Sequence, residues 1–175
     1  LGLLEPDDAE DLRRLLTYDE KSAGGIMTTE PVILAPDANV AEALARIRNE
    51  DLPTSLAAQV YVARPPLETP TGRFLGVVHF QRLLREQPGT LVSSLVDSDL
   101  ESVDPQAPLD EVVRHFARYN LVGLPVIDSN DHLLGVVTVD DVVDNMLPED
   151  WRESHTASTD TELISNRKAG EGDGS

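Results

Sequence analysis

The chain has 175 residues, enough to build a core as one repeat-based domain or as two small ones. It has 32 acidic against 14 basic residues and a formal net charge of −18, which argues against nucleic acid as a partner because phosphate backbones require Lys and Arg. The absence of Cys excludes disulfides and thiolate metal sites, no run of about 20 apolar residues predicts a membrane span, and no signal peptide is visible. These features are compatible with a cytoplasmic protein.

The excess of acid favours a cationic partner, and Mg²⁺ or Ca²⁺ is the obvious small one because both prefer oxygen ligands. An acidic surface also keeps a protein soluble without binding any ion. The charge alone leaves both interpretations open.

Residues 1–22 predict a short helix followed by a linker. Pro6 suits a first helical turn, and Leu12, Leu15 and Leu16 share one apolar face. A helix of this length is marginal alone, so we expect it to be the end of a helical domain that lies upstream. The linker continues into residues 22–30 (SAGGIMTTE), whose paired glycines predict a tight connection.

The rest of the chain contains an internal repeat, which is sought before any fold is assigned. Residues 33–44 (ILAPDANVAEAL) match 102–113 (SVDPQAPLDEVV), and residues 74–84 (FLGVVHFQRLL) match 133–143 (LLGVVTVDDVV). Pro105 lies 69 positions after Pro36, whereas Gly135 lies 59 positions after Gly76, so copy one has ten additional residues between these positions. Some of them fall in the Pro-rich loop 65–72 and others around 49–58.

Each copy is predicted to run strand, helix, strand, strand, helix. In copy one the strands are expected at 32–34, 60–62 and 74–78, with helices at 38–48 and 79–85; in copy two the strands are expected at 101–103, 123–127 and 133–137, with helices at 109–119 and 139–146. A short helical connector is expected at 90–96 and a hairpin turn at 128–131. Pro148 should end the last helix, and the polar residues after it predict a disordered tail.

This ordered set, present twice, resembles the cystathionine-β-synthase (CBS) domain. Copy two has the fuller match, at 103–105 (VDP), 123–128 (GLPVID) and 135–141 (GVVTVDD). The resemblance implies an α+β fold, a tandem CBS-domain pair of two βαββα repeats packed pseudo-symmetrically, and a homodimer through the CBS helices. We expect CBS domain 1 over 23–92 and CBS domain 2 over 93–147, between a helical remnant at 1–22 and a disordered tail at 148–175.

The segment SAGGIMTTE resembles the junction between the acidic helical N-domain and the CBS pair of MgtE-type magnesium transporters. This resemblance implies a bacterial, cytoplasmic regulatory module for magnesium transport, with the upstream N-domain and a membrane channel domain as partners. In that family a long acidic helix follows the last CBS helix, and the polar tail here departs from this pattern. A soluble relative without a channel therefore remains an alternative.

A nucleotide site is implied where copy two enters its last helix. In CBS domains an [ST]-x-x-D motif at this place binds an adenosine ribose, and the resemblance therefore assigns the binding of ATP or AMP to Thr138 and Asp141. Val103, Leu124 and Pro125 would supply apolar walls. The same spacing is also that of a capping box, with Thr138 at the N-cap.

Copy one has His79-Phe80-Gln81-Arg82 at the equivalent place, without a hydroxyl or a carboxylate. We therefore expect one nucleotide site per pair, at copy two. His79 itself is expected to be a helix cap or a surface residue rather than a ligand.

The MgtE resemblance also assigns Mg²⁺ ligands to Asp110, Asp141 and Asp144. Asp141 and Asp144 are three residues apart on one predicted helix and face the same way. Asn120 stands where a further acid would be expected, and the alternative is a solvated acidic face.

No catalytic motif is found: the sequence has neither a P-loop, nor a nucleophile elbow, nor His residues at metal-ligand spacing. The first hypothesis is therefore a Mg²⁺-sensing regulatory module and not an enzyme. A soluble adenine-nucleotide sensor that regulates another protein is the second hypothesis, and a ligand-free dimerisation module is the third.

Overall fold

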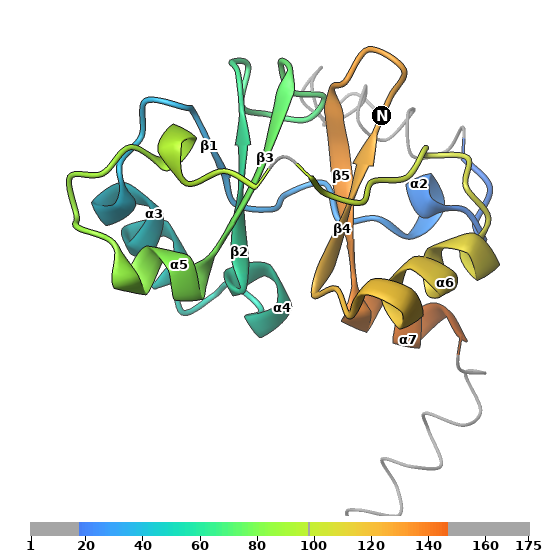
Figure 1. Ribbon diagram of the computed structural model, residues 1–175. Helices are drawn as coiled ribbons and strands as arrows, with labels where there is room; N and C mark the ends of the chain where they lie inside the picture. Colours follow the sequence, from blue (N-terminus) through green and yellow to red (C-terminus); the bar gives the residue numbers. More distant parts are fainter. Residues whose placement is uncertain (1–17, 98, 147–175) are drawn as a thin grey trace, which may run out of the picture. The chain divides into compact units, whose positions relative to one another are not determined.

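The computed structural model describes residues 18–97 and 99–146, so the predicted helix before residue 18, Pro148 and the predicted tail lie outside the described residues. The chain divides into a unit that ends at Val142 and a second unit, of which residues 143–146 are described. In chain order the elements are α2 (Ala23–Ile26), β1 (Ile33–Leu34), α3 (Val40–Ile47), α4 (Thr54–Ala57), β2 (Gln59–Ala63), β3 (Phe74–His79), α5 (Phe80–Arg85), η1 (Val92–Ser94), α6 (Leu109–Tyr119), β4 (Gly123–Ile127), β5 (Leu133–Thr138) and α7 (Val139–Met146) (Figure 1).

Copy one forms a three-stranded sheet in the order β1-β2-β3. Strand β1 is parallel to β2, and β2 is antiparallel to β3 in a register that pairs Tyr61 with Val77. Helices α3 and α5 pack against each other beside this sheet (Figure 1). Helix α3 begins two residues later than predicted because the Asn39 side chain accepts a hydrogen bond from the Glu42 amide at 2.9 Å and so caps the helix at Val40.

Copy two forms the antiparallel pair β4-β5, and its expected first strand at 101–103 is reduced to one parallel bridge between Val103 and Val126. The repeat explains this difference. In copy one the Tyr61 amide donates to Val32 O at 2.8 Å. Pro125 stands at the equivalent position of β4 and has no N–H to donate, so the parallel pairing is one step shorter.

The segments that precede the two copies exchange partners (Figure 1). Thr28, which precedes copy one, pairs with Val136 of copy two through two backbone hydrogen bonds of 2.8 and 2.9 Å. Asp97, which precedes copy two, pairs with Val77 of copy one at 3.0 and 3.4 Å. Each sheet therefore gains an edge partner from the segment that introduces the other copy.

Two glycines make this exchange possible. A Cβ atom at Gly76 would lie 2.4 Å from Asp97 O, and one at Gly135 would lie 2.8 Å from Thr28 O. Gly76 also has φ of +146°, a backbone conformation that favours glycine. The Gly-Val-Val sequence of each copy thus reserves room for the incoming segment.

The expected tight linker at Gly24 and Gly25 is instead one turn of helix, α2, capped by the Ser22 hydroxyl, which accepts from the Gly25 amide at 3.2 Å. Gly24 allows this turn to approach copy two, because a Cβ there would lie 2.9 Å from Pro105 O. Ala23 and Ile26 of α2 pack into the core of copy two, although they precede copy one in sequence.

The buried side chains form one cluster in each copy and a third cluster that joins the two sheets. The third cluster comprises Ile33, Tyr61, Ala63, Val77, Leu133 and Val136. Within the ranges that the structure describes, no helix is long and apolar enough to cross a bilayer.

Candidate functional site

The predicted nucleotide motif at the start of α7 is a capping box. The Thr138 amide donates to Asp141 Oδ2 at 3.0 Å, and the Asp141 amide donates to Thr138 Oγ1 at 3.2 Å. The Thr28 hydroxyl also donates to Asp141 Oδ2, at 3.2 Å. Asp141 therefore stabilises the helix start and fixes the segment that precedes copy one, so the capping interpretation is confirmed.

The predicted apolar walls lie in two different places. Val103 and Leu124 are buried in the core of copy two, whereas Pro125 lines a hollow beside copy one's last strand. The structure thus separates two of the three wall residues from the hollow described below, and a ligand at Thr138 and Asp141 stays a prediction.

The three predicted metal ligands are distributed over two helices. Asp110 is in the first turn of α6, is exposed, and lies 3.9 Å from Arg114. Asp141 makes the contacts given above, and Asp144 is in the last turn of α7. In the described part of the chain, no three acidic, His or Cys side chains are grouped closely enough to hold a metal ion.

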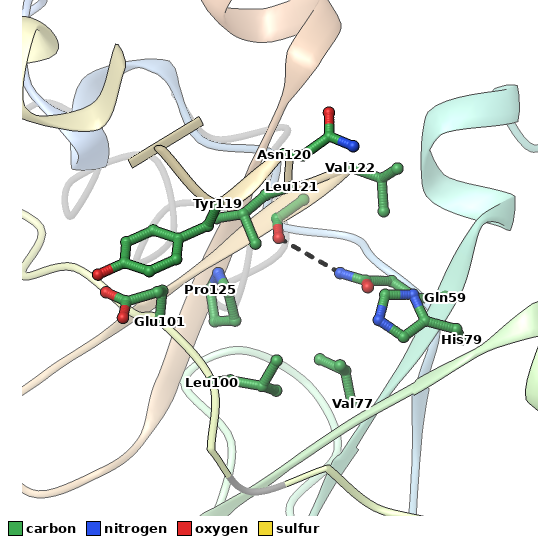
Figure 2. Close-up of a pocket in the computed structure, with 11 residues that line it drawn as sticks. Gln59, Val77, His79, Leu100, Glu101, Tyr119, Asn120, Leu121, Val122 and Pro125 are labelled. Atoms are coloured by element: carbon green, nitrogen blue, oxygen red, sulfur yellow. Dashed lines mark hydrogen bonds between the residues drawn. The ribbon is translucent and has the colours of Figure 1, made fainter. Parts of the chain in front are cut away.

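A hollow lies at the start of α5, the copy-one counterpart of the predicted site (Figure 2). His79 pairs with Gln59 at the end of β3, just as Thr138 pairs with Gly123 at the end of β5. The hollow has a cavity volume of about 140 Å³. It is lined by Gln59, Val77, His79, Leu100, Glu101, Tyr119, Asn120, Leu121, Val122, Gly123 and Pro125.

The hollow is polar at its base, where the carboxamide of Gln59 lies beside the His79 ring (Figure 2). Gln59 Nε2 donates to Tyr61 Oη at 2.6 Å and to Gly123 O at 3.4 Å. Burial raises the pKa of the Tyr61 phenol well above its usual value, and the hydrogen bond from Gln59 lowers it part of the way back. Tyr61 is therefore neutral at physiological pH.

The rim of the hollow carries an acid, Glu101, next to the ring of Tyr119 (Figure 2). Glu101 Oε2 lies 3.1 Å from His115 Nδ1, a distance that suits an ion pair, although the two groups are not aligned as a hydrogen bond. The His115 ring stacks on Tyr119 with centroids 6.2 Å apart, and the Arg118 guanidinium lies 5.4 Å from the Tyr119 centroid. Tyr119 thus stands between the hollow and the cationic side of α6.

The sequence prediction missed this hollow because it depends on contacts between the copies. His79 was expected to be a cap or a surface residue; it is exposed, and its side chain makes no capping hydrogen bond. Tyr119 and Val122 are exposed apolar residues around the end of α6, where Asn120 ends the helix with φ of +51°. The signal available in the sequence was the run of residues 119–122, which places apolar side chains directly before the buried strand β4 and so could have indicated a hollow there.

The sequence profile of the CBS domain matches residues 23–89 and 92–148. Among curated proteins, the chain is 31% identical to a magnesium transporter MgtE of Thermus thermophilus over 87% of this chain and 33% of that protein. It is 30% identical to a magnesium transporter MgtE of Enterococcus faecalis over 91% of this chain and 34% of that protein. The chain therefore spans about a third of the length of these relatives.

Two solved structures share the fold and a similar level of identity. The soluble part of a magnesium transporter superposes with a TM-score of 0.70 at 30% identity, over 83% of this chain and 55% of that one. The cytosolic domain of the Mg²⁺ channel MgtE in complex with ATP superposes with a TM-score of 0.69 at 33% identity, over 82% of this chain and 56% of that one.

Proposed function

The chain belongs to the CBS-domain family, and because it contains the domain as a tandem pair similar to the cytosolic part of MgtE, we propose that it is the regulatory region of an MgtE-like magnesium transport protein. It senses Mg²⁺ and regulates by conformational change; it is not an enzyme. The observation that supports this most directly is the similarity to MgtE along most of the chain, from the segment before copy one to the end of copy two.

The net charge of −18 supports a cation as the regulator. Repulsion between carboxylates disfavours compact arrangements of the whole protein, and a divalent cation relieves it. The cation shifts the equilibrium only by its difference in affinity for the compact and open states. A channel domain and an upstream helical N-domain would be the parts that respond, at the cytoplasmic face of a membrane.

We assign Asp110, Asp141 and Asp144 to cation binding as part of this proposal. The exposed Asp110 has only a long ion pair to Arg114 to give up, so a cation there loses little protein contact. Asp141 is different, since a cation must compete with the Thr28 and Thr138 donors. Cation binding at Asp141 would therefore loosen the segment that connects copy one to the upstream N-domain.

An adenine nucleotide is the second ligand in the proposal. A structure similar to this chain is in complex with ATP, and this chain has a hollow between its copies that is apolar with a polar base. Asp141 is already engaged by two protein donors and is less free to bind ribose hydroxyls, which favours the hollow near His79 as the place for the ligand. A soluble nucleotide sensor that acts on another protein would use the same hollow.

Homodimer formation through the CBS helices is also part of the proposal. Helix α5 exposes Phe80 and Leu84, the latter at 62%, and α7 exposes Val139. Exposed apolar side chains on the helix that follows the sheet suit a contact with a second copy of this chain. CBS domain 1 would then comprise residues 23–92 and CBS domain 2 residues 93–147.

The proposal is tested by thermal unfolding of the chain in MgCl₂, with NaCl at matched ionic strength as control. A ligand that binds only the folded state stabilises it by about 2.7 kcal/mol at 100 times its dissociation constant. We expect a Mg²⁺-specific rise in Tm that is lost when Asp110→Asn and Asp144→Asn are combined. The matched control combines Glu50→Gln and Asp51→Asn, two exposed acids of copy one, and should keep the rise. If the rise in Tm falls equally in both variants, Mg²⁺ acts only through general charge screening.

A further inference from the structure

The hollow beside His79 has room for one flat ring system and not for a whole nucleotide. Its cavity volume is about 140 Å³. An engineered cavity of roughly 150 Å³ in another protein holds a benzene molecule, whereas pockets that enclose drug-sized ligands occupy roughly 300–1,000 Å³. A nucleotide bound here would place its base inside and leave its sugar and phosphates outside.

The walls of the hollow suit such a ring. Leu100, Leu121 and Val122 line it together with Val77 and Pro125. An aliphatic lining favours a planar aromatic ligand, because the faces of its ring are then removed from water.

The base of the hollow offers one specific polar group. Gln59 is 3% exposed and lines the hollow. Its Nε2 atom is fixed by Gly123 O, which can only accept a hydrogen bond, and Nε2 also donates to Tyr61 Oη. Gln59 Oε1 is therefore the acceptor left for a ligand, and it requires an N–H donor such as an exocyclic amino group.

The charges around the hollow give no support to phosphate. None of the described residues that line it is Lys or Arg; the one histidine among them is His79 and the one acid is Glu101. Arg82, on α5, lies outside the lining and pairs with Glu86 at 3.4 Å. Phosphate groups are normally held by Arg, Lys or backbone amides, so the outer part of a nucleotide would gain little here.

The cations of α6 belong to a neighbouring depression, which has Tyr119 in common with the hollow. That depression is lined by Glu111, Arg114, His115, Arg118 and Tyr119. The Arg118 guanidinium lies over the Tyr119 ring, 5.4 Å from its centroid, and Arg114 lies near Asp110. The Tyr119 ring and the Glu101 carboxylate lie together at the rim on this side of the hollow (Figure 2).

We infer that the hollow recognises the amino-substituted purine base of its ligand and not the phosphates, so that adenosine, AMP and ATP bind with nearly equal affinity. This inference rests on the proposed nucleotide site and adds its specificity. It makes the site a sensor of total adenine nucleoside and nucleotide, and not of the ratio of ATP to its hydrolysis products.

The test is calorimetric titration of the chain with adenosine, AMP and ATP, in EDTA and at one ionic strength so that Mg²⁺ does not enter. The three dissociation constants should agree within about threefold. Purine riboside, which lacks the amino group, should bind at least tenfold more weakly. A tenfold or larger gain from adenosine to ATP would overturn the inference while leaving a nucleotide site in place. Binding of none of the three would overturn both the inference and the nucleotide site, whereas the Mg²⁺ proposal is tested separately by unfolding.

Two pairs of variants sharpen the test. Gln59→Met should abolish the preference for adenosine over purine riboside, and Gln81→Met, at an exposed position of α5, should not. Because Gln59 is buried, a second variant avoids the core: Val122→Arg places a cation at the rim and should make ATP bind about tenfold more tightly than adenosine. Leu91→Arg, at an exposed position away from the hollow, is its control. If ATP gains nothing in Val122→Arg, phosphates do not pass the rim and the proposed orientation of the ligand is wrong.

Discussion

The two strand-to-helix junctions of the repeat occupy equivalent places but are held in different ways. In copy two, Thr138 and Asp141 close a capping box, and Thr28 adds a third hydrogen bond. In copy one, His79 makes no capping hydrogen bond with its side chain, and a hollow lies beside it. The junction of copy two is closed by hydrogen bonds of its own side chains, whereas the junction of copy one borders a hollow.

The same contrast extends into the sheets. Tyr61 in β2 donates its amide to Val32 and places a buried phenol between the copies, whereas Pro125 in β4 does neither. Gln59 of β2 fills space beside Gly123 of β4, and a Cβ atom on that glycine would lie 2.5 Å from Tyr61 Oη. The copies are therefore complementary at their interface, because the bulky polar residues lie on one side and the small ones on the other.

The largest expected effect is at the glycines that admit the exchanged segments. Gly76→Ala should destabilise the fold by about 3–5 kcal/mol, because it adds backbone strain at φ of +146° to a collision with Asp97 O. Gly135→Ala should cost about 1–3 kcal/mol, because its Cβ would meet Thr28 O at 2.8 Å and the flexible Met27 side chain at 2.7 Å, but without the strain of a positive φ. Urea unfolding measures both, and Gly89→Ala, which meets open space, is the control. Equal costs at Gly76 and Gly135 would contradict the strain argument.

The next effect compares two buried residues at equivalent places on α5 and α7. Leu83 is fully buried, and Leu83→Ala should cost about 3 kcal/mol. Val142 is 6% exposed and smaller, so Val142→Ala should cost roughly 1–2 kcal/mol. Chemical denaturation of the two variants, with exposed Leu91→Ala as control, measures the difference. A greater loss at Val142 would mean that copy two contributes the more rigid core.

The junctions themselves provide a smaller contrast. Thr138→Ala should cost about 1 kcal/mol through loss of the cap, and Asp141→Ala somewhat more because the Thr28 bond is lost as well. His79→Ala should change the free energy of unfolding very little. Differential scanning calorimetry resolves these shifts. A large destabilisation by His79→Ala would show that the copy-one junction is stabilised by its side chain after all.

The smallest effect concerns pH. Burial raises the pKa of Tyr61 above the usual value of about 10, so above that pH the unfolded chain loses this proton while the folded chain keeps it. The contribution of Tyr61 to the free energy of unfolding is therefore fully present below pH 10 and declines as the pH rises. Tyr61→Phe should lower the free energy of unfolding by about 1 kcal/mol at pH 8, because the hydrogen bond from Gln59 is lost. Between pH 9 and 11 the free energy of unfolding of this variant should fall less than that of the parent. Parallel declines in urea titrations would contradict this account.

Apolar periodicity and turn residues are local signals, and they predicted most helices and strands. The repeat and its resemblance to the CBS domain predicted the tandem CBS fold. Helix 109–119 and strand 123–127 were predicted with the bounds that the structure has. The turn at 128–131 is confirmed by the positive φ of Asp131. The additional helix α4 was missed within the predicted connection, since its four residues contain no full apolar period.

The candidate site was less predictable because it is made of contacts between segments far apart in the chain. Thr138 and Asp141 suggested both ribose binding and a helix cap, and the hydrogen bonds from the Thr138 amide and the Thr28 hydroxyl show how the carboxylate is engaged. Gln59 gave no signal in sequence, since its importance comes from Gly123 and Tyr61. Local pattern therefore located the junctions but could not show which one faces the hollow.

The exchange of Thr28 and Asp97 has a consequence for how such a chain could have arisen. A single repeat that ended before residue 93 would retain β3 and lose the segment that pairs with it, while the segment around Thr28 would have no sheet to join. Two such molecules could pair with each other if the segment before each repeat joined the sheet of the other molecule. A gene duplication that fused them would then preserve contacts that already existed between separate ancestors, and a chain cut between the copies should reassemble from its two halves.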